Sequence, residues 1–329
     1  MAQPASEVAI SEGLEAIGTP GVSVVGRTPW QIFWGRFRKD TVAIAGALFI
    51  LALIIVAVTA PILSKVLVHH GPNQQFSDIG VNEFGLPAGP NPQFWFGFDQ
   101  AGRDVFVRTI YGARTSLVVA FFATGISVIV GVFLGVIAGF FRGWIDTLIS
   151  RTIDVVMSLP ILLFAIGIAA ACSISAKGCV AGLVQPGLVL VVVIISLVNW
   201  TYIARIVRGQ VFSLREREFV EAARSMGAGN LRIMFRELLP NLAAPIIVYA
   251  TLIVPNNILF EAALSFLGVG IPQTTPSWGR MLSDASSSQI FTVAWWMMLF
   301  PGVFLLLTTL AFNLVGDGLR DALDPKTAR

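Results

Sequence analysis

The chain has 329 residues, of which 55% are hydrophobic and only 12% are charged, and its mean hydropathy is +0.79. Soluble domains carry about 25% charged residues, so this composition excludes an ordinary water-soluble protein and indicates an integral membrane protein in a lipid bilayer. Two cysteines and two histidines are too few for a haem, zinc or iron–sulfur framework. The net charge of +3 could suggest nucleic acid, but the placement of the basic residues favours the membrane, and we expect no nucleic-acid partner.

Six stretches are apolar over the roughly 20 residues that a helix needs to cross a bilayer. They must be helical, because a membrane offers no water to satisfy exposed backbone groups. The expected spans are Thr41–Leu63, Ser116–Phe141, Ile153–Ala171, Leu188–Ala204, Leu242–Phe260 and Phe291–Val315. The sequence therefore predicts an all-α membrane protein with six transmembrane helices, the first of which is an added anchor over residues 41–63.

The basic residues predict the orientation. With the N-terminus inside, 16 of the 22 Lys and Arg residues fall in cytoplasmic segments, which agrees with the positive-inside bias. Both termini are then cytoplasmic, with residues 1–40 and 316–329 as tails, and residues 1–40 lack the pattern of a signal peptide. Residues 64–115 form an extracytoplasmic loop, and residues 205–241 form a long cytoplasmic loop between the fourth and fifth spans.

The extracytoplasmic loop contains charged and metal-binding residue types. Two adjacent histidines, at positions 69 and 70, are weak evidence for a metal site, and we expect none. Four charged residues lie near the start of the second span. They indicate a structural ion-pair network rather than substrate ligands, and they are Arg103, Asp104, Arg108 and Arg114.

The second span carries three glycines spaced four residues apart, Gly131, Gly135 and Gly139. Small residues at this spacing line one helix face and let another helix approach closely. The stripe is either a packing seam, inside the bundle or against a partner, or a result of the abundance of glycine in membrane helices. Three glycines in register favour the seam.

Two features mark the third span and its outer end. Asp154 opens the span beside Arg151, which indicates a helix-end charge rather than a transport site. Cys172 and Cys179 bracket the start of the following outer loop. The outside is oxidising and the separation permits a bridge if the loop folds back, so a disulfide and two free thiols both remain open.

Polar residues also occur in the later spans. Asn256, Asn257 and Glu261 follow Pro255 near the outer end of the fifth span, and Asn199 lies in the fourth. These side chains either line a transport pathway or form hydrogen bonds between helices, and the sequence favours neither.

The cytoplasmic loop over residues 205–241 reads as helix, turn and helix along the membrane surface. Residues 221–223 favour a helix, Gly227 and Gly229 stop it, and Asn230 is expected to cap a second short helix through about Leu239. The loop is either a docking element for another protein or an amphipathic, Arg-rich loop of the kind that positive-inside bias produces. The residues alone leave these two readings even.

The stretch Glu221-Ala222-Ala223, followed by Gly227 and ending in Leu239-Pro240, resembles the EAA loop of ABC importer permeases. Glu237 stands where the family has isoleucine, so the ending departs from the pattern. In the family this loop forms a coupling helix that docks into a groove of the ATP-binding subunit. The resemblance implies this ATPase-coupling role for Glu221, Ala222, Ala223, Arg224 and Gly227.

Three further blocks, which begin at Asp99, Glu261 and Leu314, are similar to segments of DppC/OppC-type permeases. These are the second permease subunits of dipeptide and oligopeptide importers. The resemblance implies a five-helix ABC permease core over residues 116–315, with residues 205–241 as its coupling loop, in the plasma (inner) membrane of a prokaryote.

No Walker lysine loop occurs in the sequence, so we expect a non-enzymatic subunit without a cofactor of its own. The resemblance implies half of a translocation path for di- or oligopeptides, paired with a homologous permease subunit of DppB/OppB type. It also implies two ATP-binding subunits, which bind ATP and Mg, and an extracytoplasmic peptide-binding protein. The alternatives are a related importer for nickel or another small solute and, in a different class, a secondary transporter, which leaves the Glu-Ala-Ala loop without a partner.

Overall fold

A computed structural model describes residues 29–174, 179 and 187–323. Apart from isolated β-bridges, the regular structure in these residues is helical. The helices are α2 (Pro29–Phe37), α3 (Thr41–Leu63), the π-helix η1 (Ser64–Val68), α4 (Ser77–Gly80), α5 (Val105–Phe141), α6 (Gly143–Ser158), α7 (Ile161–Ile174), α8 (Leu188–Leu214), α9 (Glu218–Ser225), α10 (Asn230–Arg232), the π-helix η3 (Ile233–Leu238), α11 (Leu239–Phe266), α12 (Trp278–Ser286), the 3₁₀ helix η4 (Ser287–Thr292) and α13 (Trp296–Leu323).

Five helices in the described part of the chain are long and apolar enough to cross a membrane, and the bent pair α6–α7 can provide a sixth crossing. The all-α, multi-pass fold is therefore confirmed. The first span begins and ends where it was predicted, but α5 begins at Val105 rather than Ser116. The predicted C-terminal tail is helical through Leu323, while residues 324–329 lie outside the described part. A helix can continue beyond the apolar core of a bilayer, because its backbone N–H and C=O groups bond to one another. Hydropathy identifies only the apolar part of such a helix.

The third predicted span, Ile153–Ala171, is sharply bent at Pro160, where a proline inside an apolar run is expected to kink a helix. The chain forms α6 and α7 here, which meet at an angle of 88°. Leu159 between them is extended, with ψ of 137°, and Pro160 follows it. Proline disfavours the helical conformation of the residue before it and supplies no N–H for a helical hydrogen bond, so the helix breaks there.

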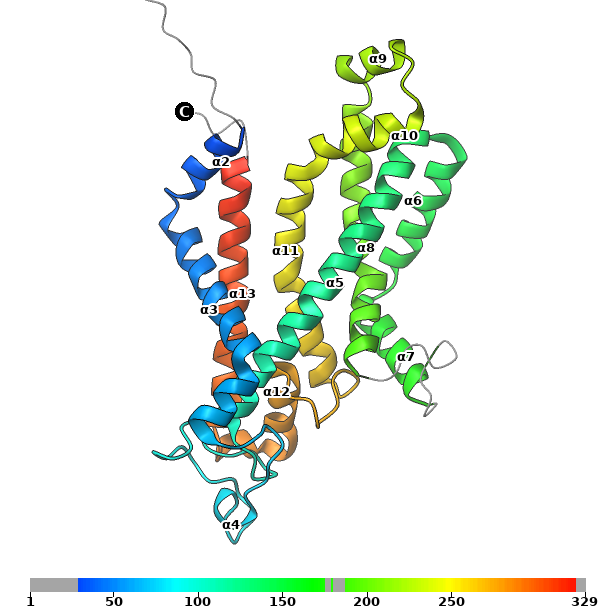
Figure 1. The fold of residues 1–329 in the computed structure, drawn as a ribbon. Coiled ribbons are helices and arrows are strands. Elements are labelled where there is room, and N and C mark those ends of the chain that lie inside the picture. The colour runs from blue at the N-terminus through cyan, green and yellow to red at the C-terminus, as the bar shows by residue number, and fades with distance from the viewer. Residues whose placement is uncertain (1–28, 175–178, 180–186, 324–329) are drawn as a thin grey trace, which may run out of the picture.

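Figure 1 shows two ends of the bundle. Helices α2 and α9 and the last turn of α13 lie at one end, which we call the α9 end, and α4 lies at the other, the α4 end. Helix α5 crosses the whole molecule between these ends, and α3 runs beside α13 (Figure 1). The first and last described residues therefore lie at the same end of the bundle (Figure 1).

The glycine stripe of α5 packs against α8 within this chain. The three glycines are buried, and a Cβ atom on any of them would collide with α8. A Cβ atom added to Gly131 would lie 2.6 Å from Cβ of Ile203, one added to Gly135 would lie 2.7 Å from the carbonyl oxygen of Ala204, and one added to Gly139 would lie 2.7 Å from Cβ of Val211. Close packing of this kind is one of the main contributions to the association of helices in a membrane.

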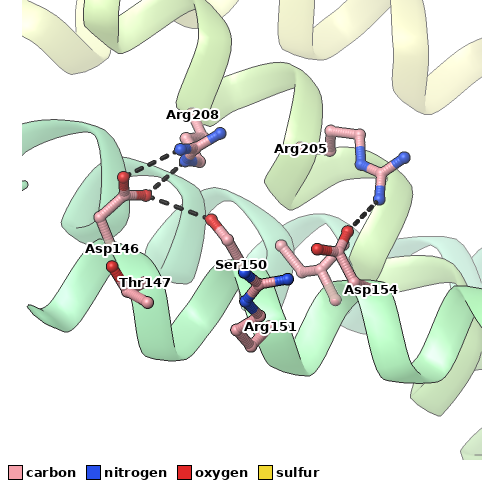
Figure 2. A pocket seen from close by; sticks show the side chains of 8 residues that line it. Asp146, Thr147, Ser150, Arg151, Asp154, Arg205 and Arg208 are labelled. Atoms are coloured by element: carbon pink, nitrogen blue, oxygen red, sulfur yellow. Dashed lines mark hydrogen bonds and ion pairs between the residues drawn. The ribbon is translucent and has the colours of Figure 1, made fainter.

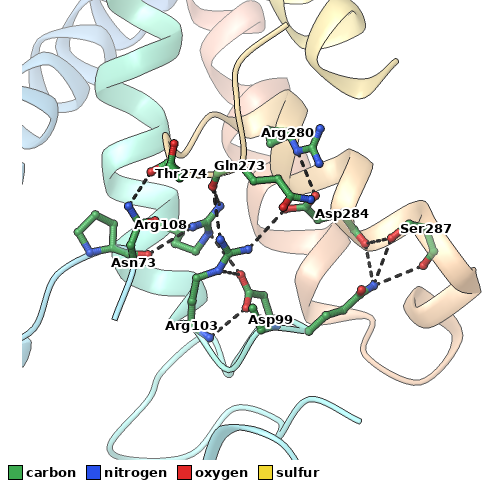
Figure 3. A network of polar contacts seen from close by, with 12 residues as sticks. Asn73, Asp99, Arg103, Arg108, Gln273, Thr274, Arg280, Asp284 and Ser287 are labelled. Carbon is green, nitrogen blue, oxygen red and sulfur yellow. Dashed lines mark hydrogen bonds and ion pairs between the residues drawn. The ribbon is translucent and has the colours of Figure 1, made fainter. Parts of the chain in front are cut away.

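A charged network fixes the segment before α5 to the segment before and within α12 (Figure 3). Arg103 Nε lies 2.7 Å from Asp99 Oδ2, and a nitrogen of the buried Arg108 lies 3.4 Å from the same oxygen. Arg280 lies 3.1 Å from Asp284, which also faces Arg103 at 3.7 Å. Burial raises the pKa of the Asp284 carboxyl, although the nearby arginines oppose the shift.

Two residues predicted for this network have other positions. Asp104 caps α5, where it accepts a hydrogen bond from Phe106 N at 2.7 Å, and it pairs with Nε2 of His70 at 2.9 Å. Burial raises the pKa of the Asp104 carboxyl, against the lowering effect of the His70 hydrogen bond. Arg114 is exposed on α5.

At the far end of α7, Cys172 and Cys179 are joined by a disulfide, with their Cα atoms 4.9 Å apart.

Candidate functional site

Helix α9 contains the Glu-Ala-Ala segment. It begins with Glu218 and Glu221 in its first turn, where acidic side chains interact favourably with the helix dipole. It ends in a glycine stop, because Gly227 adopts a φ of +80°, a conformation that residues with a Cβ atom rarely adopt. Ala228 N donates to Ala223 O at 3.0 Å and Gly227 N to Arg224 O at 2.9 Å, which is the bonding pattern of a Schellman motif.

The segment after the turn differs from its prediction. The N-cap of the next helix is Gly229, and Asn230 is its first residue rather than its cap. There is also no second, separate short helix within this described segment, because α10, η3 and α11 form one continuous helical span over Asn230–Phe266. The turn after α9 is therefore joined directly to a membrane-crossing helix.

One face of α9 is buried and the other is exposed. Val220 and Ala223 pack in an apolar cluster with residues of η3 and with Phe140 of α5. Four of the five predicted coupling residues, namely Glu221, Ala222, Arg224 and Gly227, are exposed. The buried alanine holds the helix on the bundle, and the exposed residues form a surface that another protein could contact.

Arg215, which the sequence reasoning missed, ties the base of this loop to α5. Its Nη1 donates to Phe140 O at 2.6 Å and to Gly139 O at 3.4 Å, so it satisfies carbonyls at the end of α5 that have no helical partner. Burial lowers the pKa of its guanidinium. Beside it, Arg142 Nη2 lies 2.5 Å from Glu216 Oε1. The only signal for this role in the sequence was the position of Arg215 just after a long apolar segment, and other arginines of the chain have similar positions.

A second candidate feature is an open cavity of about 670 Å³ between α7, α8 and α11, which we call the side cavity. Its wall is mostly aliphatic and aromatic. Its polar residues are Asn199, Tyr202, Tyr249 and Asn256. The side cavity therefore combines apolar surface with a few amide and phenol groups, as small-molecule sites do.

The structure separates the three polar residues predicted on the fifth span. Asn256 lines the side cavity, whereas Asn257 and Glu261 are fully buried in the bundle. Asn257 bonds with Asn199 and donates to Thr124 Oγ1 at 2.8 Å. Glu261 accepts hydrogen bonds from serine hydroxyls of α5 and α11, each at 2.8 Å. Successive residues of a helix point about 100° apart, so neighbouring positions cannot all face one cavity.

A third feature is a polar cleft of about 360 Å³ between α6 and α8 (Figure 2). Arg208 of α8 pairs with Asp146 of α6, with a second bond between Nη2 and Oδ2 at 2.9 Å. Arg205 Nη2 lies 2.9 Å from Asp154 Oδ1. Asp154 is thus within α6 and pairs across to α8, which corrects its interpretation as a helix-end charge.

Comparisons with known proteins agree with this architecture. Residues 131–329 match the family "Binding-protein-dependent transport system inner membrane component", and residues 28–83 match the "N-terminal TM domain of oligopeptide transport permease C". The fold is similar to a chain of the MetNI methionine ABC transporter in an inward-facing conformation. In that comparison the TM-score is 0.53 and the identity 18%, over 67% of this chain and 96% of that one.

Similar sequences extend over nearly the whole chain. The dipeptide transport system permease protein DppC of Alkalihalophilus pseudofirmus is 43% identical over 91% of this chain and 90% of its own length. The glutathione transport system permease protein GsiD of Pectobacterium atrosepticum is 38% identical over 91% of this chain and 92% of its own length. The chain is therefore a multi-pass inner-membrane protein that belongs to the permease subunits of binding-protein-dependent ABC importers.

Proposed function

We propose that this chain forms one half of the translocation path for di- or oligopeptides and that a homologous permease subunit forms the other half. Two ATPase subunits, which bind ATP and Mg, supply the energy, and an extracytoplasmic peptide-binding protein delivers the substrate. In this proposal the α9 end is cytoplasmic. The main support for this proposal is the exposed face of α9. Coupling to a separate ATPase requires an element that packs against the bundle on one face and is exposed on the other, as α9 does.

The side cavity is the proposed half of the path. It is lined by three helices and is open rather than enclosed, so a second subunit would close it in the assembled importer. Its lining residues include amide and phenol groups and no carboxylate, imidazole or thiolate. Such groups suit the neutral amide backbone of a peptide better than a nickel ion, which prefers imidazole and other strong ligands. The names of the dipeptide and glutathione permeases to which the chain is similar point to the same substrate class.

The test is a charge reversal on the exposed face of α9. In a reconstituted importer, Glu221→Lys should lower ATP-driven dipeptide uptake strongly while the subunit still reaches the membrane, because it removes a contact to the ATPase. Glu83→Lys is the matched control, since Glu83 is exposed at the opposite end of the molecule. Wild-type uptake in Glu221→Lys would refute the coupling role, and uptake without any ATPase subunit would favour a secondary transporter.

A further inference from the structure

The polar cleft lies next to the side cavity, on the side nearer the α9 end. On α8, Tyr202 lines the side cavity, and Arg205, one turn further along, lines the polar cleft. On the other wall, Ile161 lines the side cavity at the start of α7, and Asp154 lines the polar cleft about one turn before the end of α6. The two hollows are therefore neighbours along α8 and along the α6–α7 pair, and they share no lining residue.

The two ion pairs of the polar cleft differ in how firmly they are held. The side chains of Asp146 and Arg208 are only 16% and 30% exposed, and their two-pronged contact is supported by Ser150, which donates to Asp146 at 3.2 Å. Asp154 and Arg205 are 55% and 52% exposed and share a single hydrogen bond. An exposed pair of this kind contributes little to stability, so another charged group can replace either partner at small cost.

A third arginine gives the polar cleft its excess charge. Arg151 lines it from α6 without an ion pair among the described residues (Figure 2). Three arginines face two aspartates here, which leaves a formal charge of +1. The polar cleft can therefore accept a carboxylate on its arginines while Asp154 is available to an ammonium group. A short peptide with free ends carries both of these charges.

We propose that the polar cleft is a binding site for the charged ends of the peptide as it leaves the side cavity. Arg205 and Arg151 bind the terminal carboxylate, and Asp154 binds the terminal ammonium. The fixed Asp146–Arg208 pair holds α6 against α8 and keeps the site in shape. This inference rests on the proposed role of the side cavity as half of the path.

Thiol labelling tests the site in the assembled importer. Cys172 and Cys179 are bonded to each other, so Thr147→Cys introduces a free thiol in the polar cleft. In inverted membrane vesicles, dialanine should slow the labelling of this thiol by a charged methanethiosulfonate. Arg205→Gln should raise the half-protecting concentration about tenfold, because a hydrogen bond between charged groups is lost. The C-terminal amide of dialanine should protect less well by a similar factor.

Two controls make the result decisive. Lys39→Cys, at an exposed position outside the polar cleft and outside residues 205–241, should be labelled without protection by dialanine, and Lys39→Gln should leave the protection of Thr147→Cys unchanged. Absence of protection by dialanine while wild-type proteoliposomes still import it would overturn the inference and leave the proposed function standing. Slow labelling that depends on anionic lipid rather than on dialanine would also overturn it, since the occupant would then be a lipid phosphate.

Discussion

Replacement of Arg215 by alanine should uncouple transport from ATP hydrolysis. Arg215 donates to Phe140 O at 2.6 Å, and a hydrogen bond to a charged group contributes about 2 kcal/mol, so its loss shifts the docking equilibrium of the α8–α9 linker about thirtyfold. The carbonyls at the end of α5 also lose their partner. Lysine keeps the charge but cannot reproduce the planar guanidinium, so Arg215→Lys should fall between alanine and the wild type.

The assay is the number of dipeptides imported per ATP hydrolysed in proteoliposomes. Lys39→Ala is the matched control, because Lys39 is an exposed basic residue outside residues 205–241. We expect the ratio to fall several-fold in Arg215→Ala and to stay unchanged in Lys39→Ala. An unchanged ratio in Arg215→Ala, with the complex still assembled, would show that the bond to α5 does not transmit the movement of α9.

Three further predictions follow from packing, charge and the disulfide. Gly135→Leu should destabilise the subunit by several kcal/mol, since a Cβ atom alone would lie 2.7 Å from a carbonyl oxygen of α8. Gly125→Leu should be tolerated, because nothing lies within 4 Å of a Cβ atom there. Thermal unfolding of the two variants in detergent distinguishes these outcomes. Burial raises the folded-state pKa of Asp104, so stability should fall as pH rises from the ordinary aspartate pKa through the raised one. Thermal melts at several pH values should show a smaller loss of melting temperature over this pH range in Asp104→Asn than in the wild type. Denatured protein alkylated without reductant should leave Cys172 and Cys179 unlabelled by mass spectrometry, and labelling of both would contradict the bridge.

Much of the fold is readable from the sequence because hydrophobic spans and glycine spacing report on local physics. The stripe at Gly131, Gly135 and Gly139 predicts a close helix contact whichever helix lies opposite. The break at Pro160 is also local, but an apolar run continues through it, and hydropathy averages over the bend. The Asn230 cap was wrong by one residue, because the helix begins at Asn230 with Gly229 as its N-cap, and the helix then continues without a break to Phe266.

The candidate site was less predictable. The glycine stop after α9 follows from the conformation that Gly227 alone adopts easily, so the turn could be foreseen. Which of Asn256 and Asn257 faces a cavity depends on how α11 is rotated against α5 and α8, and no single sequence contains that angle. The contacts of Arg215 and Arg205 join residues far apart in the chain, so only the three-dimensional fold brings their partners into reach.

The length of α5 has a mechanical consequence. At 37 residues it is about 55 Å long, well beyond a hydrocarbon core of about 30 Å. The first turn of α5 is capped by Asp104, which lies in the same loop as α4. The last turn of α5 accepts a hydrogen bond from Arg215, which lies just before α9. A tilt of only about 5° at one end would move the other by about 5 Å. A small displacement at the α9 end would thus be transmitted to the α4 end through a single long helix.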